Sequence, residues 1–363
     1  MKLSDKLMAP SWVIFQLLEQ CNLRCRMCYE WGETGSYPRE KTPAALDLPL
    51  VLRTVEECLP VKPAFEFFGG EPLLYPGIWD VIRLIRKGGC DLAFPTNGTT
   101  LETDAESLVD AAPTLLWVSL DGPEPINNAQ RGAGVYQRVM RGIAAVHRVK
   151  TARGSVFPRL GINCTVTPLN YSAIEEFFLG CLDMTMLSAV SIELQSYMTA
   201  GRARQYADTL NLEFGVSSTP YADAYVRDPS VFAGIDVEDL THQLKRVSEA
   251  CAMNGVRFYS QPRTLEVSNI RNYFTANWNA MSDRRSRCGV PWIAAEISAR
   301  GDVTPCHTFY DLTIGNIYEQ SLLEIWRGAR LKRLQSHLRG GLFPVCTACC
   351  RYYNSEGTSR SGQ

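Results

Sequence analysis

Three cysteines near the beginning of the chain form the stretch best suited to chemistry. Cys21, Cys25 and Cys28 are separated by three and two residues, and Tyr29 follows directly. Thiolates are soft ligands that suit zinc or an iron–sulfur cluster. A structural zinc ion normally takes four protein ligands, and this stretch supplies three with no histidine nearby. Three thiolates leave one metal position open, so a 4Fe-4S cluster held here could bind a substrate or cofactor through its fourth iron.

The pattern from Cys21 to Tyr29 resembles the signature of radical S-adenosylmethionine (radical SAM) enzymes. The resemblance implies that the three thiolates hold three irons of a 4Fe-4S cluster, and that the fourth iron chelates the amino and carboxylate groups of S-adenosylmethionine. It also implies the activity, in which one electron cleaves the sulfonium to give methionine and a 5′-deoxyadenosyl radical. That radical abstracts a hydrogen atom from the substrate, and a flavodoxin or ferredoxin is the expected electron donor.

A pair of glycines lies in the stretch 68–72 (FGGEP). Gly69 and Gly70 let the backbone come close to a ligand, and the carboxylate of Glu71 can accept a hydrogen bond from an ammonium group. The stretch resembles the GGEP motif of the family, whose backbone groups bind the methionyl amino group of S-adenosylmethionine. A Gly-Gly sequence is otherwise most often a plain turn, and Glu71 could instead pair with a backbone amide or an arginine.

Two more stretches, 95–98 (PTNG) and 119–123 (SLDGP), match the family. Both are also common turn sequences, so turn formation is the alternative explanation. In relatives, the Ser and Asp of the second stretch point towards the ribose or the carboxylate of the cofactor. The resemblance therefore implies this role for Ser119 and Asp121.

Arg131 lies where related enzymes have an arginine near the cofactor carboxylate. The chain departs from some of these relatives just before that position. It has Asn127 and Asn128 where they carry a His-Asp pair. Substrates are therefore not carried over from those relatives.

Polar side chains also share one face on each of two later strands. By the two-residue period of a strand, Asn163 lies with Gly161 and Thr165, and Glu193 lies with Gln195. Polar groups on the inward face of a barrel need partners, which a bound nucleoside or water would supply. Glu193 could anchor a polar substrate or carry a proton, which is the expected catalytic role, or it could pair with a lysine or arginine. The expected cofactor-binding residues are Gly69, Gly70, Glu71, Ser119, Asp121, Arg131, Asn163 and Gln195.

A second group of cysteines lies near the C-terminal end of the chain. Cys288, Cys306, Cys346 and Cys349 resemble the ligands of a Twitch domain, the shorter relative of the SPASM domain, which carries one auxiliary 4Fe-4S cluster. The resemblance implies four thiolate ligands and no open iron, with Cys350 as a spare or as the replacement for Cys349. Four cysteines would also suit a structural zinc ion, for which a final Cys-x2-Cys is typical.

Alternating apolar runs and helical patterns predict the elements that position these groups. Expected strands cover residues 11–19, 64–68, 92–94, 115–120, 160–166 and 189–194, and expected helices cover 48–59, 77–87, 104–112, 135–149 and 171–182. Six strands alternating with helices argue for an α/β fold with a parallel sheet. The resemblance implies an open, TIM-like partial (β/α)6 barrel, with functional groups on the loops after the strands.

Four regions follow along the chain. The expected units are the partial barrel (1–200), a connecting region (201–285), a Twitch-like auxiliary cluster domain (286–350) and a tail (351–363). Within the connecting region, the sequence pattern predicts a helix at 238–254 and a strand at 256–261, and the remainder is expected to be irregular. The small domain predicts a β-hairpin from 292–298 and 302–304, followed by a helix at 322–338.

Composition restricts the class of protein. The chain has 363 residues, 45% of them hydrophobic and 21% charged, with a formal net charge of -1. No basic run predicts a nucleic-acid partner, and no run approaches the ~20 apolar residues of a membrane helix. Residues 1–10 lack the apolar core of a signal peptide, so the thirteen cysteines are better explained as metal ligands and buried thiols in a reducing cytosol. The expected buried thiols are Cys58, Cys90, Cys164, Cys181 and Cys251.

The leading hypothesis is a radical enzyme, a lyase or oxidoreductase, that acts on a sugar, nucleoside or aminocyclitol. The first cluster cysteine comes about twenty residues from the start, which leaves no room for an N-terminal peptide-recognition domain. The Twitch form also resembles the decarboxylases and dehydrogenases of aminoglycoside and peptidyl-nucleoside antibiotic biosynthesis. A peptide or protein maturase is the second hypothesis, and a non-enzymatic protein with two zinc sites is the third.

Overall fold

The computed structural model describes residues 9–38, 41–306 and 310–353, without the side chains of residues 350 and 351. Its strands are β1 (Trp12–Gln16), β2 (Ala64–Phe68), β3 (Leu92–Thr96), β4 (Leu115–Ser119), β5 (Arg159–Val166), β6 (Ala189–Leu194), β7 (Arg257–Gln261), β8 (Ala294–Ile297), β9 (Asp302–Thr304) and β10 (Gly315–Asn316). Over the described ranges they form one sheet in the order β10-β9-β8-β1-β2-β3-β4-β5-β6-β7. Neighbours from β8 to β7 pair in parallel, and β9 pairs antiparallel with β8 and β10.

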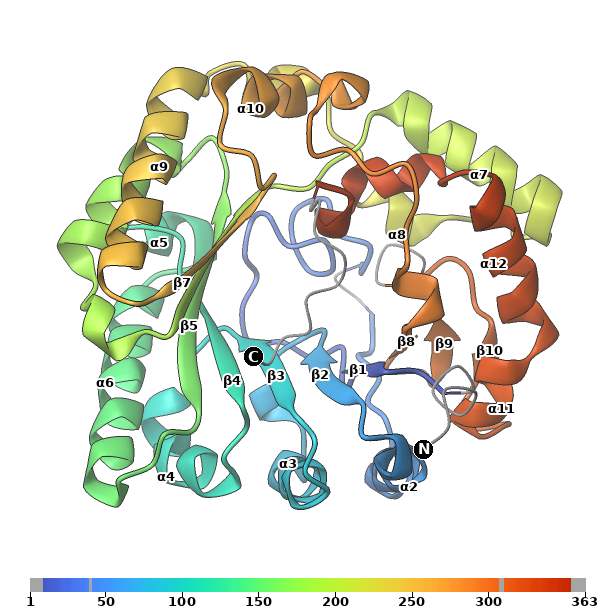
Figure 1. Ribbon diagram of the computed structural model, residues 1–363, viewed down its shortest axis with the longest axis horizontal. Helices are drawn as coiled ribbons and strands as arrows, with labels where there is room; N and C mark the ends of the chain where they lie inside the picture. The colour runs from blue at the N-terminus through green and yellow to red at the C-terminus, as the bar shows by residue number, and fades with distance from the viewer. Residues whose placement is uncertain (1–8, 39–40, 307–309, 354–363) are drawn as a thin grey trace.

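The helices lie mainly on the outer side of this sheet. They are α2 (Leu48–Cys58), α3 (Ile78–Lys87), α4 (Leu101–Ala111), α5 (Glu124–Arg131), α6 (Val135–Arg153), α7 (Ala200–Phe214), α8 (Pro220–Asp223), α9 (Val237–Met253), α10 (Val267–Phe274), α11 (Leu322–Arg327) and α12 (Ala329–Gly340). Figure 1 shows the parallel strands curved around an interior, with α2, α3, α4, α6 and α9 outside and the chain between β1 and α2 inside the curve. The expected α/β partial barrel is therefore confirmed.

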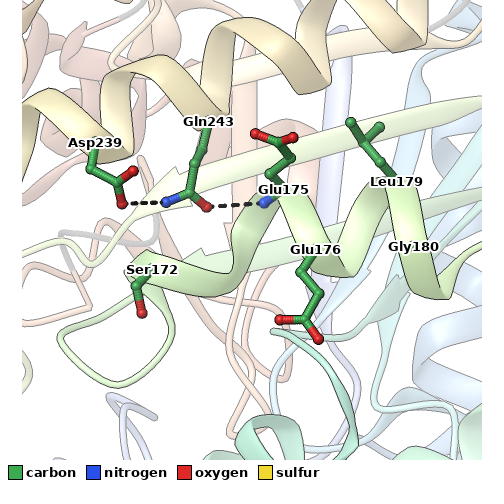
Figure 2. A pocket seen from close by; sticks show the side chains of 7 residues that line it. All are labelled: Ser172, Glu175, Glu176, Leu179, Gly180, Asp239 and Gln243. Atoms are coloured by element: carbon green, nitrogen blue, oxygen red, sulfur yellow. Dashed lines mark hydrogen bonds between the residues drawn. The ribbon is translucent and has the colours of Figure 1, made fainter.

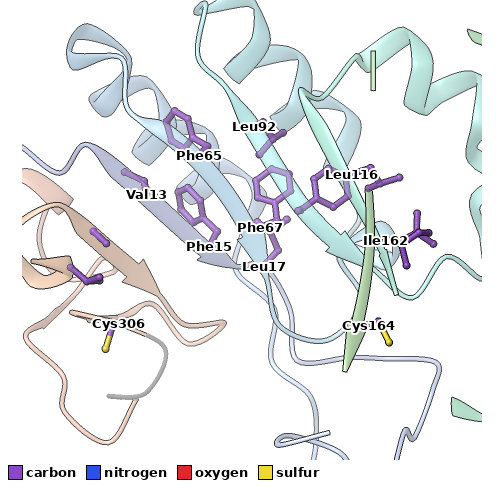
Figure 3. Close-up of a cluster of buried hydrophobic side chains, with 14 of the residues drawn as sticks. Val13, Phe15, Leu17, Phe65, Phe67, Leu92, Leu116, Ile162, Cys164 and Cys306 are labelled. Atoms are coloured by element: carbon purple, nitrogen blue, oxygen red, sulfur yellow. The ribbon is translucent and has the colours of Figure 1, made fainter. Parts of the chain in front are cut away.

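The two faces of the parallel strands differ in polarity, as strand alternation requires. On β5, Leu160, Ile162 and Cys164 belong to the hydrophobic core, which Figure 3 shows together with its counterparts from β1 to β4. Asn163 and Thr165 lie on the opposite face, towards the interior, and are only partly buried. The outer face therefore holds the fold together, and the inner face is available for a ligand.

Two expected helices differ in the structure. The stretch 171–182 forms a short 3-10 turn and then a π-helix, Glu176–Cys181, which buries the consecutive residues Phe177 and Phe178. π-helices are rare and occur mostly as single turns, so the helical pattern of the sequence did not predict this one. The stretch 322–338 divides into α11 and α12 because Gly328 adopts an extended conformation, with φ of -67° and ψ of 163°.

Three parts of the sheet and its surroundings were not predicted. The strand predicted at 256–261 forms as β7, but its parallel pairing with β6, which extends the sheet, was not predicted. The hairpin of β8 and β9 forms as expected, and β8 also pairs in parallel with β1. The helices α5 and α7 are additional, the second one capped by the Thr199 hydroxyl. Within the described ranges, every helix is too short or too polar to cross a lipid bilayer.

The first prediction tests how much β1 contributes to the fold. Phe15 is fully buried in the middle of the sheet, so Phe15→Ala leaves a cavity and should lower the free energy of unfolding by about 3–5 kcal/mol. Denaturant unfolding followed by circular dichroism measures this loss. Leu212→Ala, at a side chain that is 86% exposed, is the matched control and should change the value by about 0.5 kcal/mol or less. Equal losses would contradict the central role of β1.

Candidate active site

The first three cysteines lie in the loop that follows β1, inside the curve of the sheet. Backbone amides face two of the sulfurs: Leu23 N is 3.4 Å from Cys21 Sγ, and Trp31 N is 3.4 Å from Cys28 Sγ. Burial raises the pKa of the Cys21 thiol to about 11 and that of Cys28 to about 12. Such thiols keep their protons near neutral pH unless a metal cation displaces them. The loop is therefore built to ligate a metal rather than to supply a free nucleophile.

The helix α5 holds the middle of the cysteine loop. Arg26 N donates a hydrogen bond to Gln130 O at 3.0 Å. Burial raises the pKa of the Cys25 thiol, and the positive charge of Arg131, which also hydrogen-bonds this thiol, opposes the rise. The structure thus brings Arg131 directly to the second cysteine.

Arg131 contacts the carboxylate of Asp121 as well as the thiol of Cys25. The Asp121 carboxylate is fully buried and accepts from Arg131 Nε at 2.5 Å and from Arg131 Nη2 at 3.1 Å. Asp121 Oδ1 also accepts from Thr165 N at 2.9 Å. These contacts make the pair a link between the cysteine loop, α5 and the strands β4 and β5. A direct contact of either residue with the cofactor remains a prediction.

Glu71 is almost completely buried and is engaged within the protein. Its carboxylate accepts from Thr96 Oγ1 and Asn97 N, both at 2.7 Å, and from Leu73 N at 3.2 Å. Burial raises the pKa of Glu71 to about 7, and these hydrogen bonds oppose the rise. The side chain therefore joins the glycine turn to the stretch 95–98, in line with the alternative role of Glu71 as a partner of backbone amides.

The glycine turn packs directly against the cysteine loop. Gly69 and Gly70 have φ values of +72° and +33°, and a Cβ on Gly70 would lie 2.3 Å from Gln20 O. Gly70 N donates to Glu30 Oε2 at 3.1 Å, and Gln16 Nε2 donates to Glu30 Oε1 at 2.5 Å. The approach is too close for any side chain, which explains the adjacent glycines.

Tyr29 and Glu30, the two residues that follow Cys28, hold the cysteine loop in place through contacts that the sequence did not predict. Glu30 joins the loop to β1 and to the glycine turn, as described above. Tyr29 donates to Ser196 O at 2.6 Å, and its ring stacks on Tyr225 with centroids 4.1 Å apart. The aromatic residue of the signature therefore fastens the cysteine loop to the chain after β6. Its place next to the third cysteine was the only signal available.

Polar groups line the inner face where β4, β5 and β6 end. Ser119 on β4 pairs in register with Asn163 on β5. Asn163 Oδ1 is buried and accepts no hydrogen bond from the described residues. On β6, Glu193 accepts from Ser191 Oγ at 3.3 Å, and Gln195 follows the strand directly and is mostly buried. A buried acceptor without a partner fits a ligand that donates a hydrogen bond, as a nucleoside does.

The second cysteine group also comes together. Cys288, Cys306, Cys346 and Cys349 line one pocket, together with apolar residues of α12 and the segment before β8. Burial raises the pKa of the Cys346 thiol, as do the neighbouring Cys349 and Cys288. Four thiols around one apolar pocket fit a metal cluster. The side chain of Cys350 lies outside the described residues, so its role as a possible replacement stays a prediction.

The four thiols of the second group line one pocket, and thiolates are the usual ligands of iron–sulfur clusters. Both cysteine groups therefore fit iron–sulfur clusters.

A larger hollow lies elsewhere on the molecule. It has a volume of about 510 Å³ and is lined by residues of the segment 172–180 and of α9 (Figure 2). Gln243 spans it by accepting from Glu175 N at 3.0 Å and donating to Asp239 Oδ2 at 2.6 Å. None of these residues belongs to the site described above.

Two parts of the chain match known protein families. Residues 16–178 match the radical SAM superfamily, and residues 288–350 match the SPASM family, an iron–sulfur cluster-binding domain. The chain carries a radical SAM domain followed by a SPASM domain. A radical SAM domain binds S-adenosylmethionine and a 4Fe-4S cluster, and a SPASM domain binds auxiliary iron–sulfur clusters. The cofactors expected from the sequence are thereby confirmed.

Similar proteins span nearly the whole of this radical SAM chain. Pre-heme d1 synthase of Dinoroseobacter shibae is 26% identical, over 96% of this chain and 81% of its own length. AdoMet-dependent heme synthase of Methanosarcina barkeri is 26% identical, over 90% of this chain and 84% of its own. Among solved structures, Streptococcus suis SuiB bound to S-adenosylmethionine has a TM-score of 0.62 at 16% identity, covering 89% of this chain and 67% of SuiB. The last likeness shows a shared fold.

The second prediction concerns the buried ion pair beside Cys25. Arg131→Met should lower the free energy of unfolding by about 3–5 kcal/mol, because it leaves the Asp121 carboxylate buried without a counter-charge. Denaturant unfolding of the cluster-free chain measures the change. The exposed pair Arg83–Asp80, with nitrogen and oxygen 3.1 Å apart, supplies the control: Arg83→Met should cost about 1 kcal/mol or less. A small effect at Arg131 would show that the pair does not hold the loop.

Proposed function

We propose that this radical SAM enzyme removes a hydrogen atom from a small, polar natural product such as a sugar, nucleoside or aminocyclitol. The outcome would be decarboxylation or dehydrogenation, in antibiotic biosynthesis. The observation that carries the proposal is the polar inner face after β4, β5 and β6. There Asn163 Oδ1 is buried and has no hydrogen-bond partner among the described residues, beside the strand that bears Glu193. Such a face suits a ligand with several hydroxyl or amino groups.

Residues of the chain divide between two cofactors in this proposal. Cys21, Cys25 and Cys28 hold the first 4Fe-4S cluster, and Cys288, Cys306, Cys346 and Cys349 hold the auxiliary one. When bound, the first cluster and S-adenosylmethionine supply a one-electron cleavage that yields methionine and a 5′-deoxyadenosyl radical. The backbone of Gly69 and Gly70 would bind the methionyl amino group of S-adenosylmethionine, as the resemblance to the GGEP motif implies.

In this proposal, the inner face of the sheet binds the nucleoside part of S-adenosylmethionine. Asn163 Oδ1 accepts from an N–H or O–H of the nucleoside, with Ser119 beside it. Arg131 keeps the Cys25 end of the loop in place through Asp121, and Gln195 closes the site after β6. Glu193 orients a substrate hydroxyl or removes its proton. The proposal also includes a cytosolic location and a flavodoxin or ferredoxin that donates the electron.

A second candidate is a peptide maturase. It is supported by the fold shared with Streptococcus suis SuiB, which has also been solved with its precursor peptide SuiA. Two of the relatives that align over nearly the whole chain are instead named for heme synthesis, which is the chemistry of a small molecule. Their names support the small-molecule class, and a substrate panel separates the two candidates.

The third prediction tests the radical site. The protein reconstituted with iron and sulfide under anaerobic conditions should release 5′-deoxyadenosine from S-adenosylmethionine when dithionite supplies electrons. Cys25→Ala should abolish this release while retaining about four irons per chain, since the auxiliary cysteines assemble separately. Chromatography of the nucleoside and iron analysis provide the two readouts. Continued release by the variant would refute the assignment of the radical site.

The fourth prediction tests Glu193. Glu193→Gln should keep its iron and its S-adenosylmethionine binding but convert substrate about 100-fold to 10,000-fold more slowly, if the carboxylate does acid–base work. A panel of amino sugars, nucleosides, aminocyclitols and short peptides, screened by product mass, identifies the substrate for this comparison. Glu176→Gln, on the π-helix and outside the site, is the control. Wild-type turnover in Glu193→Gln would show that the carboxylate is structural.

A further inference from the structure

Strand β7 extends the sheet beyond the six strands of the expected barrel and adds a polar position to its inner face. Thr165 on β5 pairs in register with Glu193 on β6, and Glu193 pairs with Gln261 on β7. Residues in register on adjacent parallel strands point to the same face. The three side chains therefore form one row across the carboxyl ends of these strands.

An aromatic pair supports this row from below. The Trp117 ring lies over Gly161, where a Cβ would come within 2.6 Å of the ring. Trp117 also meets Tyr259 on β7, two residues before Gln261, with centroids 6.1 Å apart and planes at 76°. Gly161 and Tyr259 have the same strand parity as Thr165 and Gln261, so both rings lie on the inner face. The rings of Trp117 and Tyr259 therefore lie on the same face as the row of polar side chains, nearer the amino ends of the strands.

Gln261 carries the second buried acceptor of this interior. Its Oε1 is buried and receives no hydrogen bond from the described residues, as is the case for Asn163 Oδ1 on β5. A buried acceptor that lacks a donor is unfavourable, so its retention favours a partner other than the described residues. The two acceptors lie two strands apart, roughly 10 Å by the usual strand spacing. That separation allows two ligands to lie side by side.

We infer that Gln261 recognises the substrate by accepting a hydrogen bond from one of its hydroxyl or amino groups. The inference rests on the proposed function and places the substrate over β6 and β7, next to the nucleoside over β5. The carboxylate of Glu193, in register with Gln261, favours a neutral or cationic ring over one that bears a carboxylate. Among the proposed classes, amino sugars and aminocyclitols therefore fit best, and a sugar that bears a carboxylate, such as a uronate, fits less well.

Titrations with two sugars test this inference. The protein with reconstituted clusters and bound S-adenosylmethionine is titrated with glucosamine and with glucuronate, and binding is followed by saturation-transfer NMR. The wild type should bind glucosamine more tightly than glucuronate. Gln261→Leu should raise the Kd for glucosamine about threefold to tenfold, as expected for one lost hydrogen bond. Ser260→Ala, on the same strand but on the opposite face, is the control and should leave the Kd unchanged.

A second variant keeps the test decisive if the leucine disturbs folding. Gln261→Glu retains the acceptor and adds a negative charge, so it should bind glucosamine at least as tightly as the wild type and glucuronate more weakly. An unchanged Kd in Gln261→Leu, a wild type that prefers glucuronate, or a wild type that binds neither sugar would overturn the inference. Failure of the proposed function is recognised separately, because the dithionite assay of 5′-deoxyadenosine release contains no sugar.

Discussion

The buried ion pair between Asp121 and Arg131 is the contact on which the rest of the site depends. The Asp121 carboxylate is completely buried and is shared by the guanidinium of Arg131 and the amide of Thr165. Arg131 in turn reaches the thiol of Cys25. A charge in such a position is tolerated only with its partner, because either one alone would remain unsolvated. One pair thus fixes two strands, a helix and the middle of the cysteine loop relative to one another.

The sheet also connects the two cysteine groups to each other. The strand β1 leads directly into the first group and pairs on one side with β2, which leads into the glycine turn. On its other side β1 pairs with β8, which belongs to the SPASM domain. Gln16 lies at this junction, where its side chain donates to Glu30 and accepts from the backbone amide of Ala299. The auxiliary domain is therefore an extension of the same sheet.

Sequence reasoning was sufficient where the signal is local. The strands β2 and β6 have the predicted bounds, because short runs of buried, strand-forming residues end at clear turns. The cysteine groups were found because ligand spacing is written in the sequence itself. Helix α5 was missed because its eight residues have Ile126 as their one large apolar side chain, and its contacts with the cysteine loop stabilise it. The pairing of β1 with β8 joins opposite ends of the chain, and no local pattern predicts it.

The two faces of the sheet are under different physical constraints. This difference explains why the roles of the site residues on the inner face could not be predicted from the sequence. Outward positions must be apolar, so their alternation reveals the strands, whereas inward positions are free to vary with the ligand. Two inward oxygens, on Asn163 and Gln261, are buried without a partner among the described residues, and each such group costs about 1–3 kcal/mol. A sheet selected for stability alone would have replaced them with apolar side chains. Their retention, at the carboxyl ends of strands beside a cysteine loop built for a metal cluster, indicates that the interior is completed by its ligands, which should stabilise the folded chain when they bind.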